Sequence, residues 1–81
     1  MLIVTQDRFV LNLDHIASMW VEGIELHKFA VKADMDRYVS GRIIATYGTR
    51  ERAVEELNRL VHYYRGGAAV YEMMSVKEDD A

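Results

Sequence analysis

Two arginines at the expected start of a helix are the residues best suited to binding a ligand. Arg50 and Arg52 come directly after Thr49, whose hydroxyl suits a helix N-cap. Free backbone N–H groups at a helix N-terminus, together with cationic side chains, form a reasonable anion site. The plainer interpretation is that Arg52 pairs with Glu55 or Glu56 while Arg50 points into water. We favour it, because exposed helix charges are usually solvated or weakly paired.

Aromatic and basic residues elsewhere extend the set of candidates. Trp20 is the sole tryptophan, and Tyr63 lies off the apolar face of the expected helix, close to Arg65. An exposed tryptophan and tyrosine near arginines suit either a protein partner or a stacked nucleobase. For Trp20 we favour the plainer interpretation, a core position with its indole N–H hydrogen-bonded. Arg37 and Arg42, on the strand before the helix, would join an anion site only if they face it.

Motifs for catalysis and metal binding are absent from the sequence. It contains no glycine-rich phosphate loop, nucleophile elbow or zinc-protease signature. The absence of cysteine excludes thiol catalysis, disulfides and thiolate zinc sites. Asp34 and Asp36 could bind a cation only with more oxygen ligands than the neighbouring sequence supplies. We therefore expect no catalytic residue, no metal and no cofactor.

Length and composition predict one small domain. The chain has 81 residues, of which 51% are hydrophobic, enough for one core. We expect residues 1–76 to form this domain and residues 77–81 to form a flexible acidic tail. A domain of this size buries only about 60% of the surface of its unfolded chain. A homodimer or larger homo-oligomer is therefore a plausible source of further stability.

The charge and the apolar segments narrow the partners and the location. The net charge is −3, so no global basic field favours nucleic acid. No stretch approaches the ~20 apolar residues of a membrane span. The apolar run at the N-terminus is too short for a signal peptide. These features predict a cytoplasmic protein with neither a membrane nor a nucleic-acid partner.

The candidate residues must be positioned by a run of strands followed by one helix. The helix is predicted from residue 50 to 65, between the Thr49 cap and a stop at Gly66 and Gly67. Turns are expected at 6–8, 22–23 and 34–36. The expected strands cover residues 2–5, 9–13, 16–21, 25–33, 37–47 and 69–74. The first two strands should form a hairpin, and Gly41 should mark a bulge or bend within the fifth.

The apolar face of the predicted helix shows how it would cover the sheet. Its stripe comprises Ala53, Val54, Leu57, Leu60, Val61 and Tyr64. Tyr64 is therefore expected in the core. Together the elements predict an α+β fold, with a small curved antiparallel sheet of five or six strands packed by one helix.

Three segments carry a resemblance to a known group of proteins. They are the helix start Tyr-Gly-Thr-Arg-Glu-Arg-Ala, the stretch Gly-Gly-Ala-Ala-Val-Tyr-Glu-Met after the helix, and the early motif Leu-Asn-Leu-Asp-His-Ile. Together they resemble small uncharacterised proteins of Gram-positive bacteria and their phages. The resemblance implies a pleckstrin-homology-like half-barrel closed by one C-terminal helix. The resemblance implies no activity and no functional residues. If the protein is encoded by a phage, as some of these relatives are, a counter-defence role is suggested.

The expected function is a non-catalytic binding module that works through its surface. Its partner would be a host protein, which it blocks, or a small anionic nucleotide signal, which it sequesters. The alternative is an accessory subunit of a larger enzyme or of a transcription-associated complex.

Overall fold

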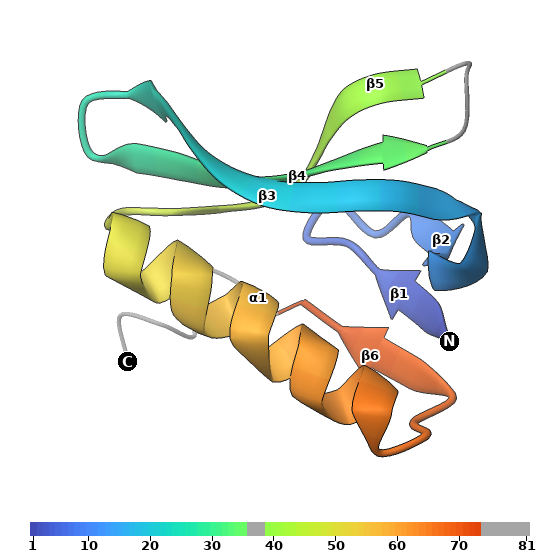
Figure 1. Ribbon diagram of the computed structural model, residues 1–81. Coiled ribbons are helices and arrows are strands. Elements are labelled where there is room, and N and C mark those ends of the chain that lie inside the picture. The colour runs from blue at the N-terminus through green and yellow to red at the C-terminus, as the bar shows by residue number, and fades with distance from the viewer. Residues whose placement is uncertain (36–38, 74–81) are drawn as a thin grey trace.

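The computed structural model describes residues 1–35 and 39–73, and its elements confirm the expected α+β class (Figure 1). Arg37, Asp36 and the expected acidic tail lie outside the described residues. A short 3₁₀ turn, η1, covers Leu13–His15. The strands and helix are β1 (Leu2–Val4), β2 (Val10–Asn12), β3 (Ile16–Glu25), β4 (Lys28–Met35), β5 (Val39–Tyr47), α1 (Arg50–Arg65) and β6 (Val70–Glu72).

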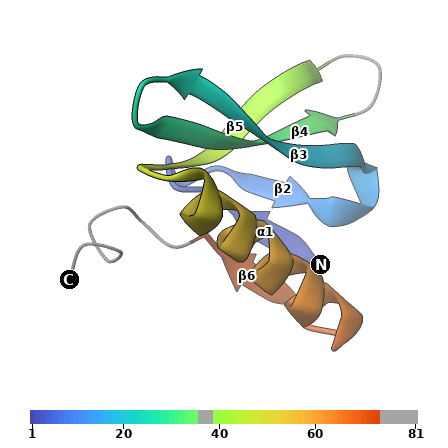
Figure 2. The same cartoon turned by 60° about the vertical axis from the view of Figure 1, so that its left-hand side comes forward.

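The strands form two sheets of three strands each, rather than one curved sheet. Their orders are β2–β1–β6 and β3–β4–β5, and neither sheet closes on itself. The expected hairpin of the first two strands is confirmed, since β1 pairs antiparallel with β2. The last strand, β6, runs parallel to β1, so the first sheet is mixed and not antiparallel throughout. Both sheets pack against the single helix (Figures 1 and 2).

The division into two sheets begins at Asn12. Its side chain accepts a hydrogen bond from the N–H of Asp14 at 3.0 Å, which starts the 3₁₀ turn. Strand β2 therefore ends at Asn12, before the expected end at residue 13. Gln6 joins the sheets at another point, because its side chain accepts from Thr46 N–H at 2.7 Å and its backbone N–H donates to Ile44 at 3.1 Å. This contact covers the outer edge of β5.

The turn expected at Glu22 and Gly23 is wrong, because β3 continues through both residues to Glu25. The chain reverses at residues 26–27 instead, where His27 has a left-handed φ of 58°. Gly23 serves packing rather than turning. It lies opposite Phe29, and an added Cβ would come within 3.3 Å of the Phe29 ring.

The turn expected at 34–36 begins later than predicted, since β4 includes both Asp34 and Met35. The carboxylate of Asp34 accepts a hydrogen bond from the N–H of Gly41 at 2.7 Å. Gly41 has a left-handed φ of 66°, which confirms the expected irregularity in this strand. The ladder between β4 and β5 shifts register here, between Ala33 and Met35, and again between Val31 and Lys32.

Helix α1 begins and ends where the sequence predicts. The hydroxyl of Thr49 accepts a hydrogen bond from Arg52 N–H at 3.2 Å, and Gly67 follows the helix with a φ of 81°. The buried residues of the helix are Ala53, Glu56 and Leu60. Three members of the predicted stripe stay substantially exposed, namely Val54 (39%), Val61 (36%) and Tyr64 (50%).

The prediction that Tyr64 lies in the core is therefore wrong. The buried face of α1 includes Glu56, whose carboxylate accepts a hydrogen bond from Tyr71 and forms an ion pair with Arg52. An apolar periodicity cannot show that a charged residue belongs to the buried face. The rest of the core comes mainly from the strands, with Ile3, Leu11, Val31, Ala33, Ile44, Ala45, Tyr47, Tyr71 and Met73.

Candidate binding surface

The two arginines at the start of α1 stack on a pair of aromatic residues. The guanidinium carbon of Arg50 lies 5.3 Å from the centroid of Phe29, and that of Arg52 lies 4.8 Å from the centroid of Tyr47. Phe29 and Tyr47 are cross-strand partners on β4 and β5. The two cation–π contacts hold the helix N-terminus on the sheet. This use of the arginines favours a structural role over an anion site.

A buried carboxylate engages Arg52 as well. Glu56 is fully buried and accepts a hydrogen bond from the hydroxyl of Tyr71 at 2.9 Å. Arg52 and Arg59 each place a guanidinium nitrogen near the same carboxylate oxygen, at 3.4 and 3.7 Å. Burial, followed by the bond to Glu56, raises the pKa of Tyr71. The plainer interpretation of Arg52 is thus confirmed, with Glu56 as its partner.

The remaining candidate arginines and Tyr63 do not gather around this point. The guanidinium of Arg42 stacks on Phe9 at 4.5 Å from the ring centroid, and Arg42 is paired with Ala33 in the strand ladder. Tyr63 and Arg65 are exposed at the other end of α1, where the Tyr63 ring contacts Tyr71 at 5.4 Å between centroids. The described candidates are therefore spread over several surfaces.

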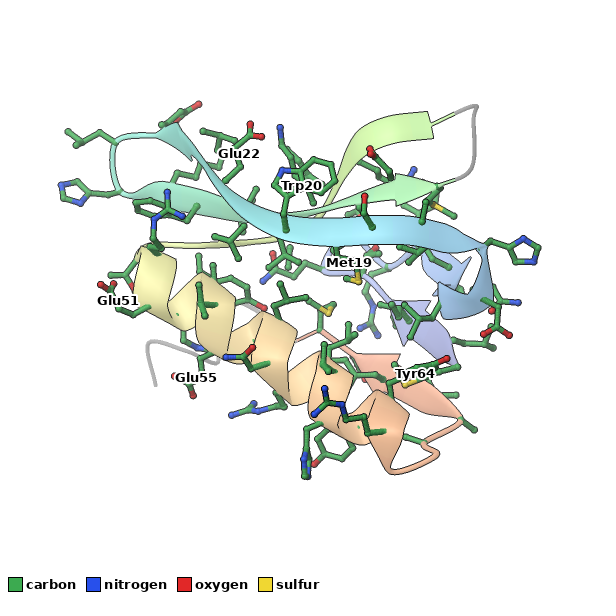
Figure 3. All side chains as sticks on the ribbon, viewed as in Figure 1. Met19, Trp20, Glu22, Glu51, Glu55 and Tyr64 are labelled. Atoms are coloured by element: carbon green, nitrogen blue, oxygen red, sulfur yellow. The ribbon has the colours of Figure 1, made fainter. Side chains whose placement is uncertain are left out.

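Trp20 lies on the face of the β3–β4–β5 sheet that points away from α1. Figure 3 shows Trp20 and Glu22 above the ribbon of β3 and Met19 below it, on the side of the helix. The indole N–H donates to one oxygen of Glu22 at 3.2 Å, and Lys32 Nζ donates to the other at 2.8 Å. The hydrogen bonds from Lys32 and then Trp20 lower the pKa of Glu22.

Register extends this face across the three strands. Trp20 is paired with Lys32, and Lys32 with Ile43, which is 42% exposed. We define the outer sheet face by these residues and their neighbours of the same orientation, namely Ser18, Trp20, Glu22, Lys32, Ile43 and Thr46. Its centre is an indole, a lysine stem and an isoleucine, and polar side chains lie on either side. Trp20 is partly exposed on this face, so the expectation that it lies in the core is wrong.

A second surface was not predicted from the sequence. An apolar groove of about 240 Å³ lies between β3 and α1, lined by Leu13, Ile16, Met19, Leu60, Val61 and Tyr64. The sequence feature that could have indicated this groove is the wide apolar stripe of the helix. The stripe has more apolar residues than the core buries, so some of them stay exposed.

The lowered pKa of Glu22 gives a testable pH dependence. Because the folded value lies below the ordinary 4.5, the contact of Glu22 with Trp20 is complete above that pH and is lost as the pH falls below it. We expect the fluorescence of Trp20, the sole tryptophan, to change with a midpoint below 4.5. Lys32→Met should raise this midpoint, because it removes the largest cause of the shift. An unchanged midpoint in that variant, measured while circular dichroism reports a folded protein, would contradict the assignment.

The described part of the chain contains neither a cluster suited to a metal ion nor a helix suited to a membrane. No group of three or more histidine, cysteine, aspartate or glutamate side chains is placed to hold a metal ion there. The helix in residues 50–65 is neither long nor apolar enough to cross a membrane. Comparison of the chain with protein-family models, with curated proteins and with solved structures found no match.

Proposed function

We propose that the protein is a non-catalytic binding module that takes a protein partner on its outer sheet face. The observation that carries the proposal is the position of Trp20 on this face, held by Glu22 and in line with Lys32 and Ile43. Binding energy at protein interfaces is concentrated in aromatic residues at the centre of a patch with polar surroundings. The expected partner presents an apolar centre with hydrogen-bond donors facing Glu22.

A small anionic ligand is less well supported by the same geometry. Arg50 and Arg52 are stacked on aromatic rings, and Arg52 also contacts Glu56. On the outer sheet face, the ammonium group of Lys32 already pairs with Glu22. A ligand would have to displace these contacts before it gained a cationic site.

Two settings for such a module remain hypotheses drawn from the sequence. One is a phage counter-defence protein that blocks a host protein. The sequence resemblance suggests this setting, and it also suggests a pleckstrin-homology-like half-barrel. The other is an accessory subunit of a larger enzyme or transcription-associated complex. Early phage genes beside the coding sequence would favour the first setting. Stable co-purification with the subunits of one complex would favour the second.

Substitution of Trp20 tests the proposed surface. The partner is first identified by affinity capture, purified and titrated into the module with Trp20 fluorescence as the signal. We expect Trp20→Ala, titrated by calorimetry, to weaken binding about 30-fold or more, as at a hot spot worth about 2 kcal/mol. Leu26→Ala is the matched control, because Leu26 is 87% exposed at the hairpin tip and outside this face. Equal affinities of the wild type and a folded Trp20→Ala variant would exclude the surface.

The ligand alternative is tested by thermal stability with a panel of nucleotides. A ligand that binds only the folded state raises Tm by mass action. We expect no shift for the wild type. A shift that disappears in Arg50→Ala or Arg52→Ala would instead support the anion site at the start of α1.

A further inference from the structure

The outer edge of β3 is open to another strand. β3 has ten residues and forms one edge of its sheet, whereas the opposite edge, on β5, is covered by Gln6. No backbone hydrogen bond from the described residues reaches the outer edge of β3. The strand contains no lysine and no proline, the residues that commonly protect an edge. Such an edge is suited to pairing with a second strand.

An apolar surface lies directly beside this edge. The groove between β3 and α1 is lined by Met19, Val61 and Tyr64, among others. Val54 lies two turns before Val61 on α1 and is also substantially exposed. A partner that pairs with β3 would therefore cover the groove and this side of the helix at once.

We propose that a second copy of the chain occupies this surface, with the two β3 strands paired antiparallel about a two-fold axis that passes beside Trp20. The pairing would join two three-stranded sheets into one of six strands. The inference does not depend on the proposed function, because the outer sheet face of each protomer stays exposed in such a dimer.

The pleat of β3 restricts the possible registers. The ladder with β4 is regular from Ser18 to Gly23 and shifts on either side, so these residues are the stretch available for regular pairing. Residues directly opposite each other must lie on the same face of the joined sheet. A two-fold axis near the middle of the stretch can therefore pass beside Trp20 or beside Val21, but not between them.

Side-chain chemistry favours the register centred on Trp20. It places Met19 opposite Val21 of the partner subunit on the inner face, so two apolar groups meet. On the outer face, Glu22 lies opposite the hydroxyl of Ser18 of the partner subunit, so no like charges face each other. The register centred on Val21 would instead leave Met19 opposite the partner's Gly23.

The helix supports the same axis independently. Arg50 lies beside Gly23, while Val61 and Tyr64 share a groove with Ile16, so α1 runs opposite to β3 (Figure 1). The three residues from Gly23 to Trp20 span about 10 Å of strand, at ~3.3 Å each. About seven helical residues cover that distance, at ~1.5 Å each.

An axis through Trp20 therefore passes close to Leu57 of the helix. Val54 and Val61 are almost equally far from Leu57, in opposite directions. The two-fold axis thus places Val54 near Val61 of the partner subunit. Both helices lie on the same face of the joined sheet, each beneath its own β3 and β4 and with further contacts to β5.

Native mass measurement tests the dimer. At tens of micromolar we expect twice the 9.4 kDa mass of the chain. Val61→Glu should give a monomer, because it places a charge in the helix contact. Val10→Glu is the matched control, because Val10 is 60% exposed on β2 in the other sheet, and it should remain a dimer. A monomeric wild type, or a dimer that persists in a folded Val61→Glu variant, would overturn the proposal.

Single cysteines test the register without depending on the folding of that variant. The chain has no cysteine, so an introduced thiol can form a disulfide with a protein thiol only across two copies. Trp20→Cys should form a disulfide-linked dimer, because the Cα atoms of opposed residues in a strand pair lie within the range of a disulfide. Ser18→Cys and Glu22→Cys should cross-link efficiently only when the two variants are mixed. Efficient cross-linking of Val21→Cys, with none for Trp20→Cys, would overturn the proposed axis.

Discussion

Glu56→Ala is expected to lower the free energy of unfolding by about 3 kcal/mol. The substitution removes the acceptor of the Tyr71 hydroxyl and the negative charge that faces Arg52 and Arg59. Breaking a buried charge pair by removing one partner typically costs about 3–5 kcal/mol, because the other groups stay desolvated. The lower end applies here, since the side chains of Arg52 and Arg59 retain some exposure to water.

Urea unfolding followed by circular dichroism measures the effect, with the slope m compared between variants. Glu55→Ala is the matched control at the preceding position of α1. Glu55 is 63% exposed and lies 3.7 Å from Arg59, so its removal should cost less than about 1 kcal/mol. Equal losses for Glu56→Ala and Glu55→Ala would show that Glu56 does not stabilise the fold through its buried partners.

A double-mutant cycle separates the hydrogen bond from the charge. Tyr71→Phe removes only the hydroxyl that donates to Glu56. A hydrogen bond to a charged group is worth about 1.5–3 kcal/mol. We expect the double variant to be more stable than the sum of the two single losses implies, because each single variant already breaks the same bond.

The order of elements was predictable because each carries a local signal. Thr49 and Gly67 mark the ends of α1, and Gly41 marks an irregularity with a positive φ. These features depend on the backbone near one residue. The division into two sheets was not predictable in this way. It depends on Asn12 starting a 3₁₀ turn, and the contact that joins the two sheets, between Gln6 and Thr46, spans forty residues of sequence.

The candidate site shows the same limit. Gly23 looked like a turn residue, whereas its role is to leave room for the ring of Phe29 on the neighbouring strand. Arg50 and Arg52 looked like an anion site, because the sequence does not show that Phe29 and Tyr47 form a cross-strand pair beneath them. The sequence identified Trp20 as a candidate, but only the strand pairing shows that its side chain lies on the face of the sheet away from α1.

The second large effect on stability follows from which face of α1 is buried. Leu60→Ala should lower the free energy of unfolding by about 2–5 kcal/mol, the usual cost of truncating a buried leucine. Leu60 is 1% exposed and belongs to the main core, so its loss leaves a cavity beneath β3 and β4. Val54→Ala should cost about 1 kcal/mol or less, because Val54 is 39% exposed.

The sequence pattern alone treats Leu60 and Val54 as members of one apolar stripe and predicts similar costs. Urea unfolding at low micromolar concentration distinguishes the two predictions and keeps any contribution from a second copy small. A large loss for Leu60→Ala beside a small loss for Val54→Ala would confirm that the helix turns Glu56 and Leu60 inward. Comparable losses would place Val54 in the core and contradict the helix phase. The side of α1 next to the groove would then lack the exposed Val54 that the two-fold pairing requires.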